Sequence, residues 1–248
     1  MKKSRIIIII LLILAVLAGV YLNRAYAFIY SRFRLIQPPA VRDYTTQIMT
    51  EKSQLITYVA IGDSLTSGVG ASSVSSTLPA LLAEKISADT KIVVSVKNLG
   101  VPGATSFEIL TGSVIDASQY NPDIITVFIG TNDMHNFVPL EKFRNNLTTA
   151  VKALHNSTRA KIYLINLPYL GAKDLILSPY DFYFDHELSK FNAVIGQVAK
   201  ETGVKLIDLY DASKKAFRDD PGVYSIDRFH PSDRGYKLWA EIIYEQFK

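Results

Sequence analysis

The sequence predicts one doubly wound α/β domain built of three layers, and two observations lead to that prediction. Five apolar runs are nearly continuous and rich in Ile and Val, which is typical of strands covered on both faces in a parallel sheet. Segments with helical spacing alternate with these runs along the chain. The 248 residues are also enough to bury a core of useful size.

An apolar segment without charges, residues 6–22, precedes the domain. Its 17 residues are at the lower limit for spanning a bilayer and exceed a usual signal-peptide core. The preceding "MKKSR" predicts a cytoplasmic N-terminus, although the arginines at 24, 32 and 34 weaken that orientation. We expect an uncleaved anchor over residues 1–27, and "AYA" at its end leaves a cleaved signal as the alternative.

Residues 28–54 are expected to be a juxtamembrane stalk, because "QPPA" breaks any helix there. The expected strands that follow are residues 55–61, 91–99, 123–130, 161–167 and 204–209. The expected helices lie near 77–88, 105–118, 140–155 and 186–201, and a last one runs from about 232 to 247. Ligands in such folds bind beyond the carboxyl ends of the strands, so residues that follow strands are the functional candidates.

Charge and composition exclude several classes of function. Much of the excess of basic residues behind the net charge of +4 lies in the first 34 residues, and a nearly neutral body is not expected to bind nucleic acid. The absence of cysteine excludes disulfides, cysteine metal sites and a cysteine nucleophile. The "DHE" at 185–187 has no second ligand pair with metal-like spacing, so neither a metal nor a cofactor is expected.

Ser64 ends the first strand-like run, in "YVAIGDSLTSGVG". A serine in that place could attack a carbonyl, cap a helix or help to hold a phosphate. The motif is not the G-x-S-x-G elbow, because Thr66 occupies the last glycine position. "NLGVPG" with Gly100 and "GTND" with Asn132 follow the next two strands, and each alone also fits an ordinary loop or a helix cap.

Near the C-terminus, "SIDRFHPSDRGY" places Asp227 three residues before His230. The carboxylate can accept from one ring nitrogen and leave the other nitrogen facing a hydroxyl. A D-x-x-H pair also occurs often by chance, in surface loops.

Taken together, the blocks "GDS", "NLGVPGATS", "GTND" and "DRFHPSDRGY" resemble, in order and spacing, the SGNH family of hydrolases, also called GDSL esterases and lipases. The resemblance covers the chain from Tyr58 to the C-terminus. It implies a three-layer α/β/α, flavodoxin-like fold with a five-stranded parallel sheet, here an SGNH hydrolase domain over residues 55–248.

The resemblance also implies roles for five residues. Ser64 is expected to be the nucleophile, with Asp227 and His230 completing a triad. Ser64, Gly100 and Asn132 are expected to form the oxyanion hole. These roles agree with the chemistry, because a serine hydroxyl needs a nearby base and an oxyanion needs donors already in place.

Neighbouring residues have simpler expected roles. Asp63 and Asp133 are expected to order their loops or cap a helix. His135 could line the mouth of the site or be a polar surface residue. The aromatic segment 177–187 could be a lid, a wall for an acyl chain, or an insertion packed on itself.

The sequence therefore predicts a membrane-anchored serine esterase outside the cytoplasm, acting on a lipid ester or an acylated glycan. The expected location is a single-pass position in the cell membrane, or secretion if a signal is cleaved. The alternative function is a flavodoxin-like module that binds a phosphate ligand without hydrolase activity.

Overall fold

A six-stranded sheet forms the centre of the computed structural model, which describes residues 2–33, 36–47, 54–172 and 174–247. The strand order is β1-β3-β2-β4-β5-β6. The five strands from β2 to β6 run parallel, and β1 pairs with β3 in the antiparallel direction. The predicted α/β fold is confirmed, but the sheet has one strand more than the five expected.

The five parallel strands lie where the apolar runs predict them. Their bounds are β2 Leu55–Gly62, β3 Val93–Asn98, β4 Ile124–Phe128, β5 Lys161–Ile165 and β6 Lys205–Ile207. The additional strand is β1, Tyr44–Thr45. It lies in the segment expected to be a stalk, and two residues are too few to show a period in the sequence.

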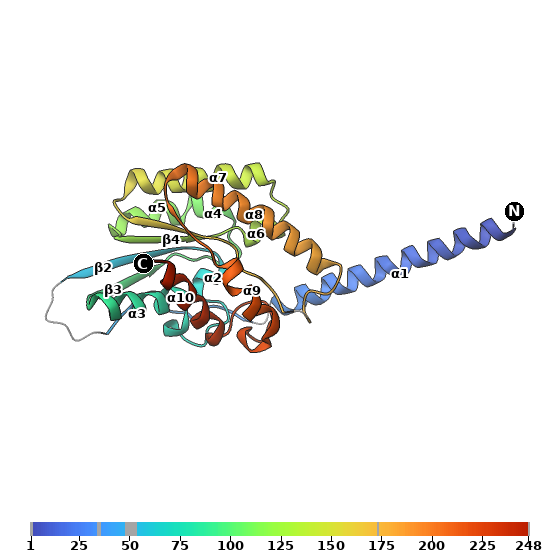
Figure 1. Cartoon of the computed structure of the whole chain (residues 1–248), viewed down its shortest axis with the longest axis horizontal. Coiled ribbons are helices and arrows are strands. Elements are labelled where there is room, and N and C mark those ends of the chain that lie inside the picture. The colour runs from blue at the N-terminus through green and yellow to red at the C-terminus, as the bar shows by residue number, and fades with distance from the viewer. Residues whose placement is uncertain (1, 34–35, 48–53, 173, 248) are drawn as a thin grey trace.

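Helices cover both faces of the sheet, which makes three layers (Figure 1). One face carries α4 Ser106–Thr111, α5 Ser113–Ala117, α6 Thr131–His135, α7 Leu140–Ser157 and α8 Tyr180–Thr202. The other carries α2 Ser64–Ser67, α3 Leu78–Thr90, α9 Tyr210–Asp219 and α10 Asp233–Phe247. Three short 3₁₀ turns complete the domain, at Val74–Ser76, Ser118–Tyr120 and Pro221–Val223.

The core lies between these layers and the sheet. Val59, Ala60 and Ile61 in the central strand β2 are fully buried, as are the larger side chains of Tyr236 and Trp239 in α10. Apolar burial of this kind on both faces explains why the strands are almost continuously apolar in sequence. It also fixes the carboxyl ends of β2, β3 and β4 side by side.

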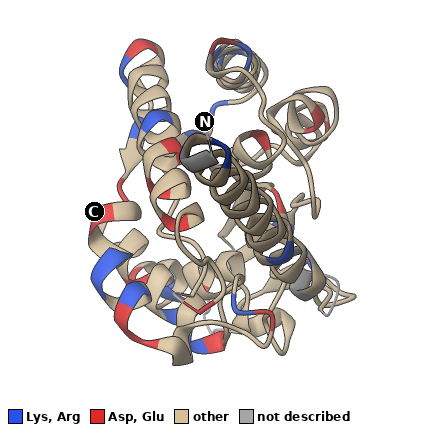
Figure 2. Ribbon diagram, turned by 90° about the vertical axis from the view of Figure 1, so that its right-hand side faces the viewer, with Lys and Arg blue, Asp and Glu red and all other residues tan. Residues whose placement is uncertain are grey.

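The helix α1, Lys2–Phe33, projects from the end of the domain where these strands finish (Figure 1). Residues Ser4–Ile29 are long and apolar enough to cross a membrane. Figure 2, in which this helix points toward the viewer, shows it tan over most of its length with a few basic positions. Its C-terminal part, from Tyr21 to Ile29, contacts the domain.

Candidate active site

Three loops meet at the carboxyl ends of neighbouring strands. Ser64 follows β2 and begins α2, Gly100 and Gly103 follow β3, and Asn132 lies in α6 after β4. Because β2 lies between β3 and β4, these loops face one another across the point where the strand order reverses.

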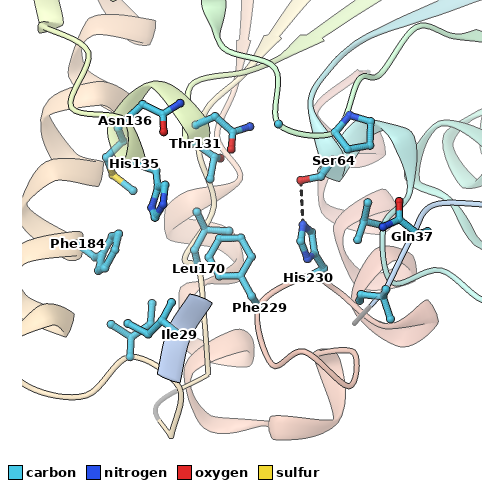
Figure 3. A pocket seen from close by; sticks show the side chains of 17 residues that line it. Ile29, Gln37, Ser64, Thr131, His135, Asn136, Leu170, Phe184, Phe229 and His230 are labelled. Carbon is cyan, nitrogen blue, oxygen red and sulfur yellow. Dashed lines mark hydrogen bonds between the residues drawn. The ribbon is translucent and has the colours of Figure 1, made fainter. Parts of the chain in front are cut away.

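A chain of hydrogen bonds joins Ser64, His230 and Asp227 (Figure 3). The Oγ of Ser64 lies 2.9 Å from Nε2 of His230, and Nδ1 of the same ring lies 2.5 Å from Oδ2 of Asp227. The structure therefore brings together the three residues that the sequence predicts as a triad. They are separated by up to 166 positions in the chain.

Asp227 is fully buried and held by three further hydrogen bonds to its other oxygen. Its Oδ1 accepts from the backbone N–H groups of Phe229 and His230 and from the Ser225 hydroxyl, at 3.0, 2.9 and 2.7 Å. Burial alone would raise the pKa of this carboxyl, but the hydrogen bond and charge of His230 outweigh it and the pKa lies below its usual value. The group is therefore a carboxylate at neutral pH.

The loop that carries Asp227 and His230 is held by an internal hydrogen bond, and it packs closely against the segment that follows Ser64. Ser225 donates from its backbone N–H to the carbonyl of His230 at 2.8 Å. At Gly70 a side chain would bring Cβ within 2.4 Å of the carbonyl oxygen of Pro231, so only glycine allows the two loops to approach this closely. The Tyr236 hydroxyl adds a bond of 2.7 Å to the carbonyl of Val69.

Asn132 points its amide toward the same pocket. Its Nδ2 donates to the carbonyl of Ala104 at 2.9 Å and lies 3.5 Å from Oδ2 of Asp63. The second contact is at the limit of a hydrogen bond, so this N–H is available to another acceptor in the cavity.

The backbone N–H of Gly100, a residue expected in the oxyanion hole, has a partner within its own loop. Its backbone N–H donates to Oδ1 of Asn98 at 3.0 Å, and a Cβ there would come within 2.4 Å of the Ser67 nitrogen. The small residue is needed for packing against α2, and its donor is already used.

Gly103, three residues later, lines the pocket beside Ser64 and Asn132. Its φ of +84° is a conformation that favours glycine. Among the described residues, no acceptor takes its backbone N–H. The sequence analysis missed this residue, although its place before the helix-start signal "ATSFE" marks a tight turn.

Two buried carboxyl groups support the loops. Asp63 accepts from the backbone N–H of Leu65 at 2.9 Å and so caps α2, and burial raises its pKa to about 7. Asp133 accepts from the backbone N–H and the hydroxyl of Ser106, at 2.8 and 2.5 Å, and burial raises its pKa too. These contacts match the ordering roles expected for both acids.

A cavity of about 460 Å³ lies beside Ser64 and His230 (Figure 3). Its apolar lining includes Val69, Met134, Leu170, Ile176, Phe184 and Phe229. His135 also lines it, and burial lowers the pKa of that imidazole. Phe184 belongs to the aromatic segment 177–187, so this segment forms part of the cavity wall.

The arrangement is poorly suited to a phosphate. A phosphate loop offers the free N–H groups of a helix start, but α2 has only four residues and the carboxyl of Asp63 already occupies its start. Nor do the described residues include a group of three His, Asp or Glu side chains that could hold a metal ion.

Comparisons with known proteins agree with this geometry. The sequence model of the GDSL-like Lipase/Acylhydrolase family matches residues 60–238. The chain is 24% identical over 228 residues to the Bacillus subtilis (strain 168) protein named "Uncharacterized protein YpmR", covering 80% of this chain and 84% of that protein.

Solved structures share the fold. The crystal structure of TesA superposes with a TM-score of 0.64 at 22% identity, over 77% of this chain and 98% of TesA. The crystal structure of the lipase/acylhydrolase from Enterococcus faecalis superposes with a TM-score of 0.60 at 28% identity, over 77% of this chain and 95% of the Enterococcus chain.

Proposed function

The chain belongs to the GDSL-like lipase/acylhydrolase family and is an ester-bond hydrolase, and from that premise we propose that Ser64, His230 and Asp227 are its catalytic triad. The observation that carries the proposal is the continuous hydrogen-bonded series Ser64–His230–Asp227 beside an apolar cavity. A buried carboxylate that orients an imidazole, which in turn contacts a serine hydroxyl, is the arrangement that activates a serine for attack.

In the proposed reaction, Oγ of Ser64 attacks the ester carbonyl while Nε2 of His230 takes the hydroxyl proton. Asp227 holds the proton on Nδ1 and stabilises the imidazolium that forms. His230 then gives its proton to the departing alcohol, which leaves an acyl group on Ser64. Water, deprotonated by His230, attacks that acyl group and releases the carboxylic acid and the free serine.

The negative charge on the carbonyl oxygen needs donors that are in place before the reaction. The backbone N–H groups of Ser64 and Gly103 and the side-chain amide of Asn132 are the proposed donors. Gly103 takes the role expected for Gly100, because it lines the cavity and Gly100 does not.

We place the domain outside the cytoplasm, attached by α1. The apolar stretch Ser4–Ile29 and the basic residues that precede it favour this orientation.

The full chain in detergent micelles should hydrolyse p-nitrophenyl butyrate and should be labelled at Ser64 by a fluorophosphonate. Peptide mass mapping identifies the labelled residue. A protein that turns over the ester but is labelled at another serine would contradict the proposed triad.

Replacing Asn132 with alanine is expected to lower kcat by roughly 10²–10³-fold, because one oxyanion donor is lost. Asn132→Asp should lower it at least as much, since a carboxylate repels the oxyanion. Steady-state kinetics with p-nitrophenyl butyrate measure both effects. Asn145→Ala, on the exposed face of α7, is the matched control and should leave kcat unchanged.

A further inference from the structure

The N-terminal helix forms part of the cavity wall. Ile29, near the end of α1, lines the cavity on the side opposite Ser64 (Figure 3). Only 3% of Ile29 is exposed, and it packs in a small cluster with Leu175 and Ile176, against Phe184 and Phe229. A segment that looks like a membrane anchor is thus also a component of the binding site.

Two hydrogen bonds fix the last turns of α1 to the domain. The Tyr21 hydroxyl donates to the carbonyl of Ser178 at 3.0 Å, and the Tyr180 hydroxyl donates to the carbonyl of Leu22 at 3.2 Å. Ala25, between these bonds and Ile29 along the helix, is buried. Cleavage after the "AYA" sequence at 25–27 would remove both hydrogen bonds and leave Ile29 close to a free end.

The apolar run of α1 ends a short distance before the cavity. The apolar run 6–22 is about 26 Å long, close to the roughly 30 Å of a bilayer hydrocarbon core. Ile29 lies seven residues further, about 10 Å beyond the end of that run. A bilayer whose hydrocarbon core holds residues 6–22 has the cavity at about the level of its headgroups.

Exposed apolar side chains stand next to the cavity in the chain. Phe137 follows the lining residue Asn136 and is 70% exposed, and Phe182 precedes Phe184 by two positions and is 72% exposed. Val101, beside the lining residue Pro102, is exposed as well. Large apolar side chains left in water near one cavity indicate a surface that contacts lipid.

From these observations we propose that the last turns of α1 are one wall of an acyl-chain pocket, and that the substrate is a lipid ester taken from the membrane in which α1 is anchored. The acyl chain lies against Ile29, Phe184 and Phe229, and the ester carbonyl lies at Ser64. Because this inference rests on the proposed triad, its test compares two substrates of the same enzyme.

The test replaces Ile29 with tryptophan in the full chain in detergent micelles, which fills the far end of the pocket. The ratio of kcat/KM for p-nitrophenyl dodecanoate to that for the butyrate should fall by about tenfold or more. Ile13→Trp, on the exposed part of the same helix, should leave this ratio unchanged. An unchanged ratio in Ile29→Trp would overturn the proposal, as would a wild-type preference for acetylated oligosaccharides.

A smaller substitution guards the test against misfolding, and an N-terminal tag shows whether α1 stays on the chain. Ile29→Ala removes the contact without adding bulk, and KM for the dodecanoate should rise more than KM for the butyrate. An N-terminal epitope tag should remain on the membrane-bound chain, and its loss by cleavage would overturn the proposal. A wild-type chain that hydrolyses neither ester would instead refute the proposed triad.

Discussion

Ser64→Ala is expected to lower kcat for ester hydrolysis by roughly 10⁵–10⁶-fold, because the acyl-enzyme can no longer form. The remaining donors of the oxyanion hole would still bind the ester and leave a small residual rate. Release of p-nitrophenol from p-nitrophenyl butyrate, followed over a long incubation for the slow variant, measures the difference. Labelling by a fluorophosphonate should disappear in the same variant.

Ser75→Ala is the control for this prediction. Ser75 lies in the short 3₁₀ turn Val74–Ser76, is exposed, and among the described residues shares a side-chain hydrogen bond with Ser73. Its replacement should keep both the rate and the label. Full activity in Ser64→Ala would show that another residue is the nucleophile.

The sequence predicts the parallel strands well because each is buried on both faces, so that its apolar run has few interruptions. Among the elements that the sequence does not predict, β1 and α9 have clear physical reasons. The strand β1 is too short to show a period, and it forms because its backbone pairs with β3. The helix α9 is largely polar, and only Ser213 and Phe217 in it are buried.

Local motifs identify the proposed catalytic residues but not the path of the loops around them. Ser64, Asp227 and His230 each stand in a distinctive block. The block "NLGVPG" offers two glycines as candidate oxyanion donors, and our proposal of Gly103 rests on the bond between the N–H of Gly100 and the Asn98 side chain. That contact follows from the folded loop, and glycine spacing alone does not reveal it.

The part of the site contributed by α1 was beyond the reach of sequence reasoning. An apolar helix near the N-terminus predicts a membrane anchor or a signal peptide, and neither interpretation predicts a contact with the active site. Its contact with residues 175–184 joins segments about 150 positions apart. Only the folded chain shows that Ile29 and Ser64 border one cavity.

Asp227→Asn is expected to lower kcat by about 10⁴-fold while the fold is kept. The carbonyl oxygen of the new amide can replace Oδ1 as acceptor for the Ser225 hydroxyl and for the backbone N–H groups of Phe229 and His230. The NH₂ group must then face the imidazole, where Oδ2 now lies. It donates to Nδ1, so the neutral ring carries its proton on Nε2 and cannot accept the proton of Ser64.

This argument separates the role of Asp227 from a general effect of charge. Asp174→Asn removes a surface carboxylate that pairs with Arg228 in the same loop at 2.6 Å, and it should change kcat less than about twofold because exposed ion pairs contribute little. Thermal unfolding should show both variants folded. A rate for Asp227→Asn equal to that of the wild type would mean that the imidazole finds its working tautomer without this carboxylate, and Asp227 would then be a structural residue of the loop.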